Sequence, residues 1–301
     1  MEWLSTIRNA IDYIETHLKD NITIQDVSNH VYLSPIHLQK GFSIISGYSI
    51  SEYIRNRKLY LAAIDLKNTN KKVLEIAYDY GYETPESFTK AFSRFHGVTP
   101  LQVRQGTSIK TFLPINLKLT RQGGDHMNIT ITKMFGLKFV GFAKEFSYET
   151  SYEEIPKFWD EIYEKYANPI YVGNQPLTPQ QQAFMDYCIG EYGVCIDDAP
   201  DVSEGKFIYL VGGKYTGGEV PEGLSVYEFE QGEWAVFDCI GPIPEAFQAL
   251  NSRIFQEWLP NNPDYELDRS ANIEWYDCIN GNSSDNDYHS AIWLPVKRKA
   301  K

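Results

Sequence analysis

Two lysines lie at equivalent places in a pattern of side chains that the first hundred residues contain twice. Ser34-Pro35 precedes Lys40, and Thr84-Pro85 precedes Lys90, with a constant offset of 50 between the copies. A Ser or Thr hydroxyl suits a helix N-cap, and proline suits the first helical position, which needs no N–H. Each lysine therefore lies on a predicted helix, where its ammonium group could reach guanine O6 and N7.

The repeat covers a helix, a tight turn and a second helix in each copy. Val27-Ser28 matches Ile76-Ala77 at an offset of 49, so the second copy holds one additional residue, which we expect in its turn at Gly81. Two helix-turn-helix units on one chain can read two successive faces of duplex DNA without a dimer, which favours a transcription regulator. Further matches at the offset of 50, whose apolar members are expected in the core, are Leu38 with Phe88, Phe42 with Phe92, Gly47 with Gly97 and Ser49 with Thr99.

A long helix separates the two units. Ser49-x-x-Glu52 forms a capping box that predicts a helix from there to about Lys67. Arg55, Arg57 and Lys58 are expected to cluster apart from the apolar side of this helix. A rigid helix of this kind fixes the separation of two recognition helices, which DNA with a helical turn of roughly 34 Å requires.

Charge is distributed unevenly along the chain. Residues 1–126 carry 15 Lys and Arg against 12 Asp and Glu, a net of +3, whereas the remainder carries a net of −15 within a total of −12. An acidic protein binds DNA poorly without sequence recognition, so only the N-terminal part is expected to face phosphate. The four cysteines form no C-x-x-C pair and no zinc pattern with histidine, so we expect reduced thiols, no metal and no cofactor. The chain start lacks the features of a signal peptide and no apolar run reaches the length of a membrane span, so a cytoplasmic protein is expected.

The second region has the pattern of an α+β domain built from two similar halves. A connector, residues 107–126, contains Gly123-Gly124 and is expected to be flexible. After it, a strand through Phe139–Phe142 precedes a helix start at Ile155-Pro156, and a strand through Trp234–Phe237 precedes another at Ile243-Pro244. Such a pairing predicts pseudo-twofold symmetry, with a ligand pocket where the halves meet. Further strands are expected at Phe207–Val211, Ile273–Tyr276 and Ala291–Val296.

Residues 5–104 resemble the DNA-binding domains of the AraC/XylS family. The matching motifs are Ala77-x-x-x-Gly81-Tyr82, Phe88, Phe92, Gly97-x-Thr99-Pro100 and Ile54-Arg55-x-Arg57-Lys58. The resemblance implies double-stranded DNA as the partner and a regulator that acts on RNA polymerase. The helix positions that it assigns to DNA contacts are Ile36, Gln39, Lys40, Glu86, Ser87, Thr89 and Lys90.

The chemistry of these positions agrees with base reading in part. Gln39 can pair with adenine in two places, and Ser or Thr can reach bases or phosphate. Glu86 can accept only from an amino group such as cytosine N4 and otherwise repels phosphate, so we expect the first recognition helix to supply more of the specificity. A protein-binding helical bundle is the alternative, but the repeat and its caps favour DNA.

The region from 127 to 301 resembles the GyrI-like effector-binding domains that accompany such regulators. The matching motifs are Val140-Gly141, Gly232-x-Trp234-Ala235-Val236-Phe237, Ile273-Glu274-x-Tyr276 and Trp293-x-Pro295. In that family a carboxylate on the corresponding strand, surrounded by aromatic rings, binds bulky apolar cations. The resemblance therefore assigns Glu274 as the charged anchor, with Tyr276 on the same face by strand parity and Trp293 in the aromatic wall. Tyr209 and Trp159 are added from the placement of aromatic residues, although a core position is the simpler expectation for both.

Other functions are weighed against this one. Glu274 could be an exposed or structural strand residue, or it could act as general acid/base in a small-molecule hydrolase. The sequence shows no Ser-His-Asp order, nucleophile elbow, metal motif or phosphate loop. An architectural nucleoid protein would leave the acidic region without a purpose. We therefore expect a regulator, not an enzyme, with an all-α tandem helix-turn-helix domain at 1–106, a linker at 107–126 and an α+β pseudo-twofold domain at 127–301.

Overall fold

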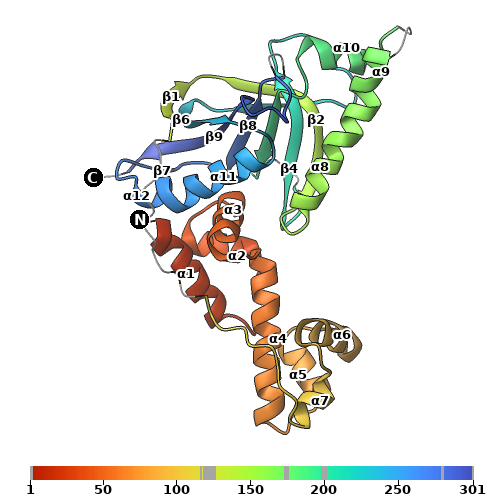
Figure 1. Cartoon of the computed structure of the whole chain (residues 1–301), viewed down its shortest axis with the longest axis vertical. Helices are drawn as coiled ribbons and strands as arrows, with labels where there is room; N and C mark the ends of the chain where they lie inside the picture. The colour runs from red at the N-terminus through yellow and green to blue at the C-terminus, as the bar shows by residue number, and fades with distance from the viewer. Residues whose placement is uncertain are drawn as a thin grey trace. The chain divides into compact units, whose positions relative to one another are not determined.

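A computed structural model describes residues 3–115, 117, 127–172, 176–197, 199, 202–278 and 281–299. The chain divides into two compact units, the first formed by Met1–Leu33 with Leu38–Leu119, and the second by Thr120–Lys301 with Ser34–His37. The first unit is helical and the second is built on a sheet, which confirms the predicted fold class (Figure 1). The expected flexible segment at Gly123-Gly124 lies outside the described residues.

The helical part consists of a long helix with three helices gathered around each of its ends (Figure 1). The predicted N-caps at Ser49 and Thr84 are confirmed: their hydroxyls accept hydrogen bonds from the backbone N–H of Glu52 at 3.1 Å and of Ser87 at 3.2 Å. Such caps satisfy backbone donors that the helix itself leaves unpaired. The helices are α1 (Trp3–Thr16), α2 (Ile24–Val31), α3 (Pro35–Ser46), α4 (Ile50–Asn68), α5 (Val73–Asp79), α6 (Pro85–His96) and α7 (Pro100–Arg104).

The turns of the two helix-turn-helix units have the same backbone course over their first residues. Tyr32 and Gly81 are both left-handed, with φ of 56° and 80°, and the residue after each donates back to the preceding helix, Leu33 to Ser28 and Tyr82 to Ala77. The expectation that the additional residue lies at Gly81 is therefore wrong. It is Glu83, because the copies stay in step through Tyr82 and are out of step at Thr84. Tyr32 adopts, as a non-glycine residue, a conformation that costs about 1–2 kcal/mol.

The predicted core positions of the two recognition helices are confirmed. Leu38, Phe42, Phe88 and Phe92 all have 0% exposure. Burying a phenylalanine side chain stabilises the fold by roughly 1.5–3 kcal/mol. In the second helix-turn-helix unit the two phenylalanines pack with residues of α4, α5 and α7, so α4 belongs to the core that holds α6.

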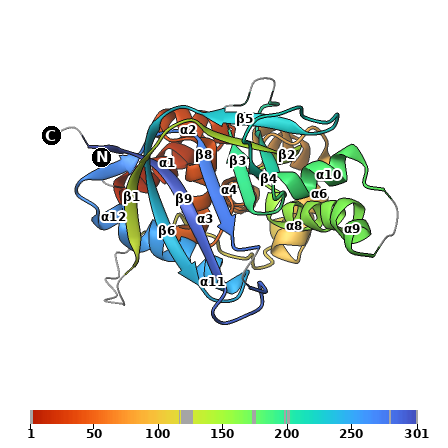
Figure 2. The ribbon, with the colours of Figure 1, turned by 90° about the horizontal axis from the view of Figure 1, so that it is seen from above.

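The second unit is one antiparallel sheet with a symmetrical strand order. The order is β1-β6-β9-β8-β3-β4-β2-β5, and β7 pairs with β9 outside this path (Figure 2). Counted from the two ends toward the middle, β1 corresponds to β5, β6 to β2, β9 to β4 and β8 to β3. The predicted pseudo-twofold axis therefore passes between β3 and β8. The strands are β1 (Ile129–Met134), β2 (Leu137–Ser147), β3 (Tyr192–Ile196), β4 (Lys206–Lys214), β5 (Ser225–Phe229), β6 (Gly232–Ile240), β7 (Tyr265–Leu267), β8 (Ala271–Tyr276) and β9 (His289–Arg298).

Each half contains one helix that is interrupted in the same way by a π-helical segment. Such segments often lie at functional sites. The predicted helix start at Pro244 is confirmed, since Pro244 is the N-cap of α11, but the start at Pro156 is wrong because α8 begins at Ser151 and contains that proline. The helical segments are α8 (Ser151–Ile162), η1 (Tyr163–Ala167) and α9 (Asn168–Val172), the separate α10 (Pro179–Asp186), and α11 (Glu245–Arg253), η2 (Ile254–Trp258) and α12 (Leu259–Asn261).

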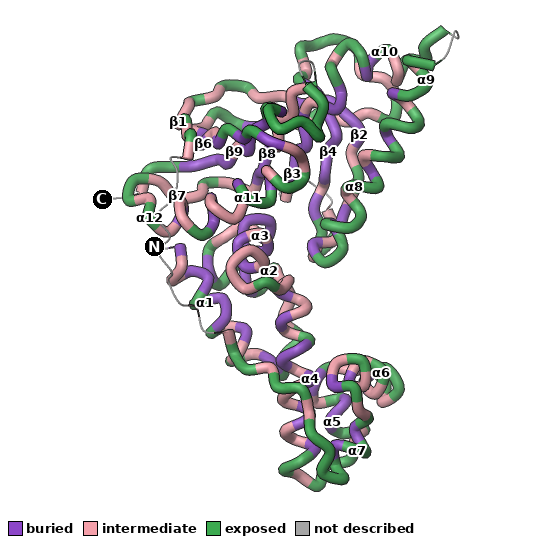
Figure 3. The backbone as a smooth tube through the Cα atoms, in the orientation of Figure 1, coloured by how far each residue is buried: buried purple, intermediate pink, exposed green. Residues whose placement is uncertain are grey.

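The two faces of the sheet have different contents. One face curls around an aromatic core in which Phe229 of β5 meets Trp234 of β6 with ring centroids 5.8 Å apart, so the two ends of the strand order approach each other. Purple tube marks buried residues along the central strands, and all residues of β3 are buried (Figure 3). The opposite face carries α8 and α11 together with Glu274. Within the described ranges, every helix is too short or too polar to span a lipid bilayer.

Candidate functional site

Helix α6 presents a polar face beside its buried phenylalanines. Glu86, Ser87 and Lys90 are exposed and Thr89 is half-buried. The Ser87 hydroxyl also donates to the Thr84 carbonyl at 2.8 Å, within the cap that begins the helix. Four of the predicted DNA-contacting side chains therefore share one short stretch at the N-terminal end of a rigid helix, the part that recognition helices insert into the major groove.

The predicted residues of α3 are more enclosed. The Gln39 side chain is 5% exposed, its Oε1 accepts from the Ile50 N–H at 3.4 Å, and its Nε2 donates to Ser43 Oγ at 3.4 Å. Its amide therefore joins α3 to the start of α4. Lys40 is half-buried, and Ile36 belongs to the segment that groups with the second unit. In α6, by contrast, three of the four predicted side chains are exposed.

The expectation of a charged cluster on α4 is wrong, because Arg55, Arg57 and Lys58 face different ways. Arg55 is exposed, whereas Arg57 is 4% exposed and binds Glu15 of α1 through two hydrogen bonds of 2.8 Å. Tyr53, one turn earlier on the same helix side, donates to the same carboxylate at 2.7 Å. Lys58 donates to the Asp20 carbonyl at 3.1 Å, and burial lowers the pKa of its ammonium group. Of the three basic residues, Arg55 is the exposed one.

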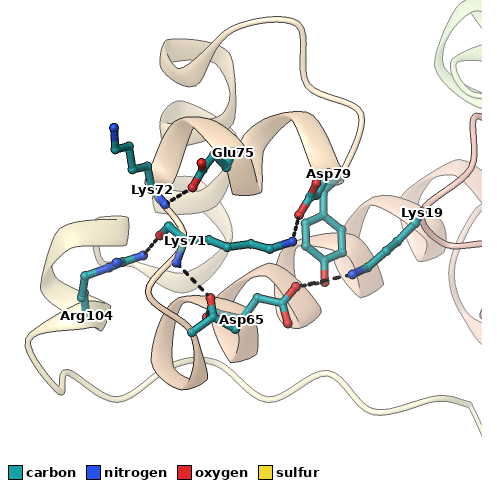
Figure 4. A network of polar contacts seen from close by, with 9 residues as sticks. Lys19, Asp65, Lys71, Lys72, Glu75, Asp79 and Arg104 are labelled. Carbon is teal, nitrogen blue, oxygen red and sulfur yellow. Dashed lines mark hydrogen bonds and ion pairs between the residues drawn. The ribbon is translucent and has the colours of Figure 1, made fainter.

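A second polar network connects α4 to the second helix-turn-helix unit (Figure 4). Tyr80, which is 2% exposed, donates to Asp65 Oδ2 at 2.9 Å, and Lys19 lies 3.6 Å from the same oxygen. The Lys19 ammonium group also lies 5.3 Å from the centre of the Tyr80 ring. Lys19 in the loop after α1, Asp65 of α4 and Tyr80 at the end of α5 thus meet at one point. A single carboxylate therefore connects the loop after α1 with the second helix-turn-helix unit.

The second unit carries a carboxylate with two phenols at the middle of its sheet. Glu274 Oε2 on β8 accepts hydrogen bonds from the hydroxyls of Tyr276 at 3.0 Å and of Tyr209, on β4, at 3.2 Å. Trp159 Nε1 of α8 donates to the Tyr209 hydroxyl at 3.0 Å. Burial, and next the charge of Glu274, raise the pKa of both tyrosines well above the usual value, so both stay neutral donors.

Aromatic rings from both helices pack against Tyr276, one of the two tyrosines that hold this carboxylate. The Tyr276 ring meets Trp159 of α8 edge-on with centroids 5.4 Å apart, and Phe247 of α11 at 5.2 Å. Trp159 stacks in turn on Tyr163, where α8 becomes the π-helical segment η1. The site therefore draws on both halves of the domain, and Glu274 lies near the pseudo-twofold axis.

A glycine makes room for the cluster on the neighbouring strand. Gly193 of β3 pairs directly with Glu274, and a Cβ atom added there would lie 2.2 Å from the Tyr209 hydroxyl oxygen. That distance is far below van der Waals contact. The hydroxyl can reach Glu274 only because residue 193 has no side chain.

The structure brings together four of the five residues predicted for this site: Glu274, Tyr276, Tyr209 and Trp159. Trp293 is not among them. It pairs with Ile273, so alternation along the strands puts it on the opposite face, where its ring meets Tyr192 edge-on at 5.8 Å.

Phe247 and Gly193 were not predicted. Phe247 could have been found, because aligning Ile155-Pro156 with Ile243-Pro244 places it opposite Trp159. Gly193 carries no such signal. Among the described residues no group of His, Cys, Asp and Glu side chains could hold a metal ion.

Comparison with known proteins assigns both parts of the chain. The family model of the integron-associated effector binding protein matches residues 130–296, and that of a helix-turn-helix domain matches residues 27–106. The right origin-binding protein of Escherichia coli K12 is 27% identical over 183 residues, which are 60% of this chain and 61% of that protein, so the match spans less than two thirds of the relative.

Two further proteins resemble one part each. The multiple antibiotic resistance protein MarA of Salmonella typhimurium is 34% identical over 115 residues, 37% of this chain and 90% of that protein. The structure of SAV2435 bound to tetraphenylphosphonium covers 57% of this chain and 94% of its own at 20% identity. Its TM-score of 0.42 is too low for that likeness to carry a ligand assignment.

The chain thus joins a helix-turn-helix domain to an effector-binding domain. The chain belongs to the family of integron-associated effector-binding proteins through its second unit, and to the AraC-type regulators through its first.

Proposed function

We propose that this regulator binds a small, apolar and cationic effector at Glu274 and that the bound effector changes how the helix-turn-helix units engage DNA. The observation that carries the proposal is the carboxylate on the central strand, which two tyrosine hydroxyls hold, with rings from α8 and α11 packed against one of those tyrosines. Tyr209 Oη and Tyr276 Oη approach the same carboxylate oxygen, so the negative charge is held at a fixed place.

The chemistry of the cluster suits an apolar cation better than a neutral or anionic molecule. A cation gains Coulomb energy from the carboxylate and about 0.5–2 kcal/mol from each aromatic face that it covers. The net −15 charge of the residues after 126 raises the local concentration of cations around the domain. An anion would gain none of these contributions and would be repelled.

Calorimetric titration with two ions of nearly the same shape tests this proposal. Tetraphenylphosphonium is the cation, and tetraphenylborate is the anionic control. We expect wild-type protein to bind the first and not the second, and Glu274→Gln to weaken cation binding at least tenfold. Glu228→Gln removes an equal charge from an exposed position on β5 and should change little. Equal affinity of wild type and Glu274→Gln for the cation would refute the assignment.

The DNA-contacting set is proposed to be Gln39, Lys40, Ile36, Glu86, Ser87, Thr89 and Lys90, with the exposed residues of α6 contributing most. Operator recognition of this kind would place the protein in the cytoplasm, at the nucleoid, where it would act on RNA polymerase. Selection from a random duplex library tests sequence specificity, and the absence of an enriched sequence would contradict it.

A hydrolase is the second candidate function, favoured by the contact of two phenol hydroxyls with one carboxylate. Glu274 could move a proton as general acid/base, with a tyrosine as hydrogen-bond donor to the substrate. Turnover of an electrophilic substrate that stops in Glu274→Gln would establish this activity. Binding of the cation without any turnover leaves the sensor function alone.

A further inference from the structure

A continuous series of aromatic rings connects the two recognition helices. Phe42 of α3 lies 5.6 Å from Tyr53 of α4, measured between ring centroids, and Tyr53 lies 6.0 Å from Phe112. Phe112 in turn meets Phe95 of α6 edge-on at 6.0 Å. Phe112 belongs to neither helix-turn-helix unit, because it follows α7 in the chain.

Phe112 lies in a segment, Ile109–Ile115, that we name the strap. Ile109 packs against the core beneath α6, and Lys110 places its ammonium group 4.9 Å from the centre of the Phe95 ring. At the other end the Ile115 N–H donates to the Tyr53 hydroxyl at 3.4 Å. The strap has no regular secondary structure but is attached to α6 at one end and to α4 at the other.

An ion pair with a buried arginine fixes the centre of the strap. Arg57 is 4% exposed, and its Nε and Nη2 bind Glu15 of α1 while its Nη1 donates to the Phe112 carbonyl. A buried charge pair is stable only when the remaining hydrogen-bonding groups of both partners are also satisfied. The strap backbone meets this need, so the position of Phe112 is tied to α1 as well as to α4.

We propose that Phe112 is a positioning residue for DNA recognition, which holds α3 and α6 at the separation that one operator spacing requires. Helix α4 spans the distance between the two helix-turn-helix units, and Phe112 adds a second connection beside it. One base pair more or less between half-sites moves them by about 3.4 Å and turns them by about a tenth of a helical turn. A ring packed between the two helix-turn-helix units resists such a change, so the protein should discriminate between half-site spacings. The inference rests on DNA binding by α3 and α6.

The test uses the full chain and the duplex that wild type selects from a random library. Affinities are measured for that duplex, for versions with one base pair inserted or removed between the half-sites, and for each half-site alone. We expect Phe112→Ala to reduce the preference for the selected spacing by about tenfold while half-site binding stays as in wild type. Phe112→Tyr keeps the ring and should restore the preference. Leu113→Ala, at a 63% exposed neighbour in the strap, is the matched control and should behave as wild type.

Two outcomes would overturn the inference. One is an unchanged spacing preference in Phe112→Ala. The other is an equal loss on every duplex, half-sites included, in a variant that unfolds at the wild-type temperature. If Phe112→Ala does not fold, Phe112→Leu, which keeps apolar volume without a ring, provides the same comparison. If wild type selects no duplex at all, the proposed DNA binding has failed and not the role of Phe112.

Discussion

Tyr32 and Gly81 occupy the same left-handed position in the two helix-turn-helix turns, which makes a residue-scale comparison within one molecule. Tyr32→Gly should raise the free energy of unfolding by about 0.5–1 kcal/mol, because it removes the strain of a non-glycine residue and the lost ring is 88% exposed. Gly81→Ala should lower it by about 1–2 kcal/mol. Urea denaturation followed by circular dichroism measures both, and effects of the same sign would contradict the comparison.

The glycine beside the carboxylate cluster gives a second prediction at this scale. Gly193→Ala should cost about 1–3 kcal/mol and abolish cation binding, because the new methyl group displaces the Tyr209 hydroxyl from Glu274 and Trp159. Tyr209→Phe removes the same hydroxyl without a clash and should cost less. Thermal unfolding of the two variants checks the order, and a harmless Gly193→Ala would show that the strand can move aside.

At the scale of elements, Asp65 connects the loop after α1 with α4 and α5. Asp65→Ala should cost about 1–3 kcal/mol, since it leaves the buried Tyr80 hydroxyl without its acceptor. Asp65→Asn keeps an acceptor oxygen and should cost much less. Lys19→Ala should cost no more than about 0.5 kcal/mol, because its ion pair with Asp65 is exposed. Urea denaturation of the three variants gives the order, and equal losses from Asp65→Asn and Asp65→Ala would assign the effect to charge instead.

A second prediction at the scale of elements concerns the contribution of helix α6 to DNA binding. Lys90→Ala should weaken binding to the selected duplex and reduce the slope of log affinity against log salt by about 1 if its contact is to phosphate, or cost about 1–3 kcal/mol at one base position if it reads guanine. Glu86→Gln should tighten binding to unrelated duplexes, because it removes a repulsive carboxylate. Filter binding across a salt series separates these effects. No change in either variant would exclude α6 from the interface.

For the whole molecule, the duplications in the sequence predicted most of the architecture. Caps at Ser49 and Thr84 and the buried i, i+4 apolar pairs are local features with one physical meaning, so the two helix-turn-helix units and the long helix between them were predicted. In the sheet domain, strand parity correctly joined Tyr276 to Glu274. It could not place Trp293, because the face on which β9 presents a residue depends on the register with β8, which no local pattern encodes. The inward turn of Arg57 and the attachment of Phe112 depend likewise on tertiary contacts.

The central claim joins the two units: an effector held at Glu274 alters DNA binding. Coupling of this kind requires the effector to favour one arrangement of the protein over another, and it is reciprocal between the two ligands. The most direct measurement is the affinity of the full chain for its selected duplex with and without saturating tetraphenylphosphonium, in wild type and in Glu274→Gln. We predict a change of at least fivefold in wild type and none in the variant, with the same affinity for DNA when no cation is present. An unchanged affinity in wild type that has bound the cation, or an equal change in both proteins, would contradict the account.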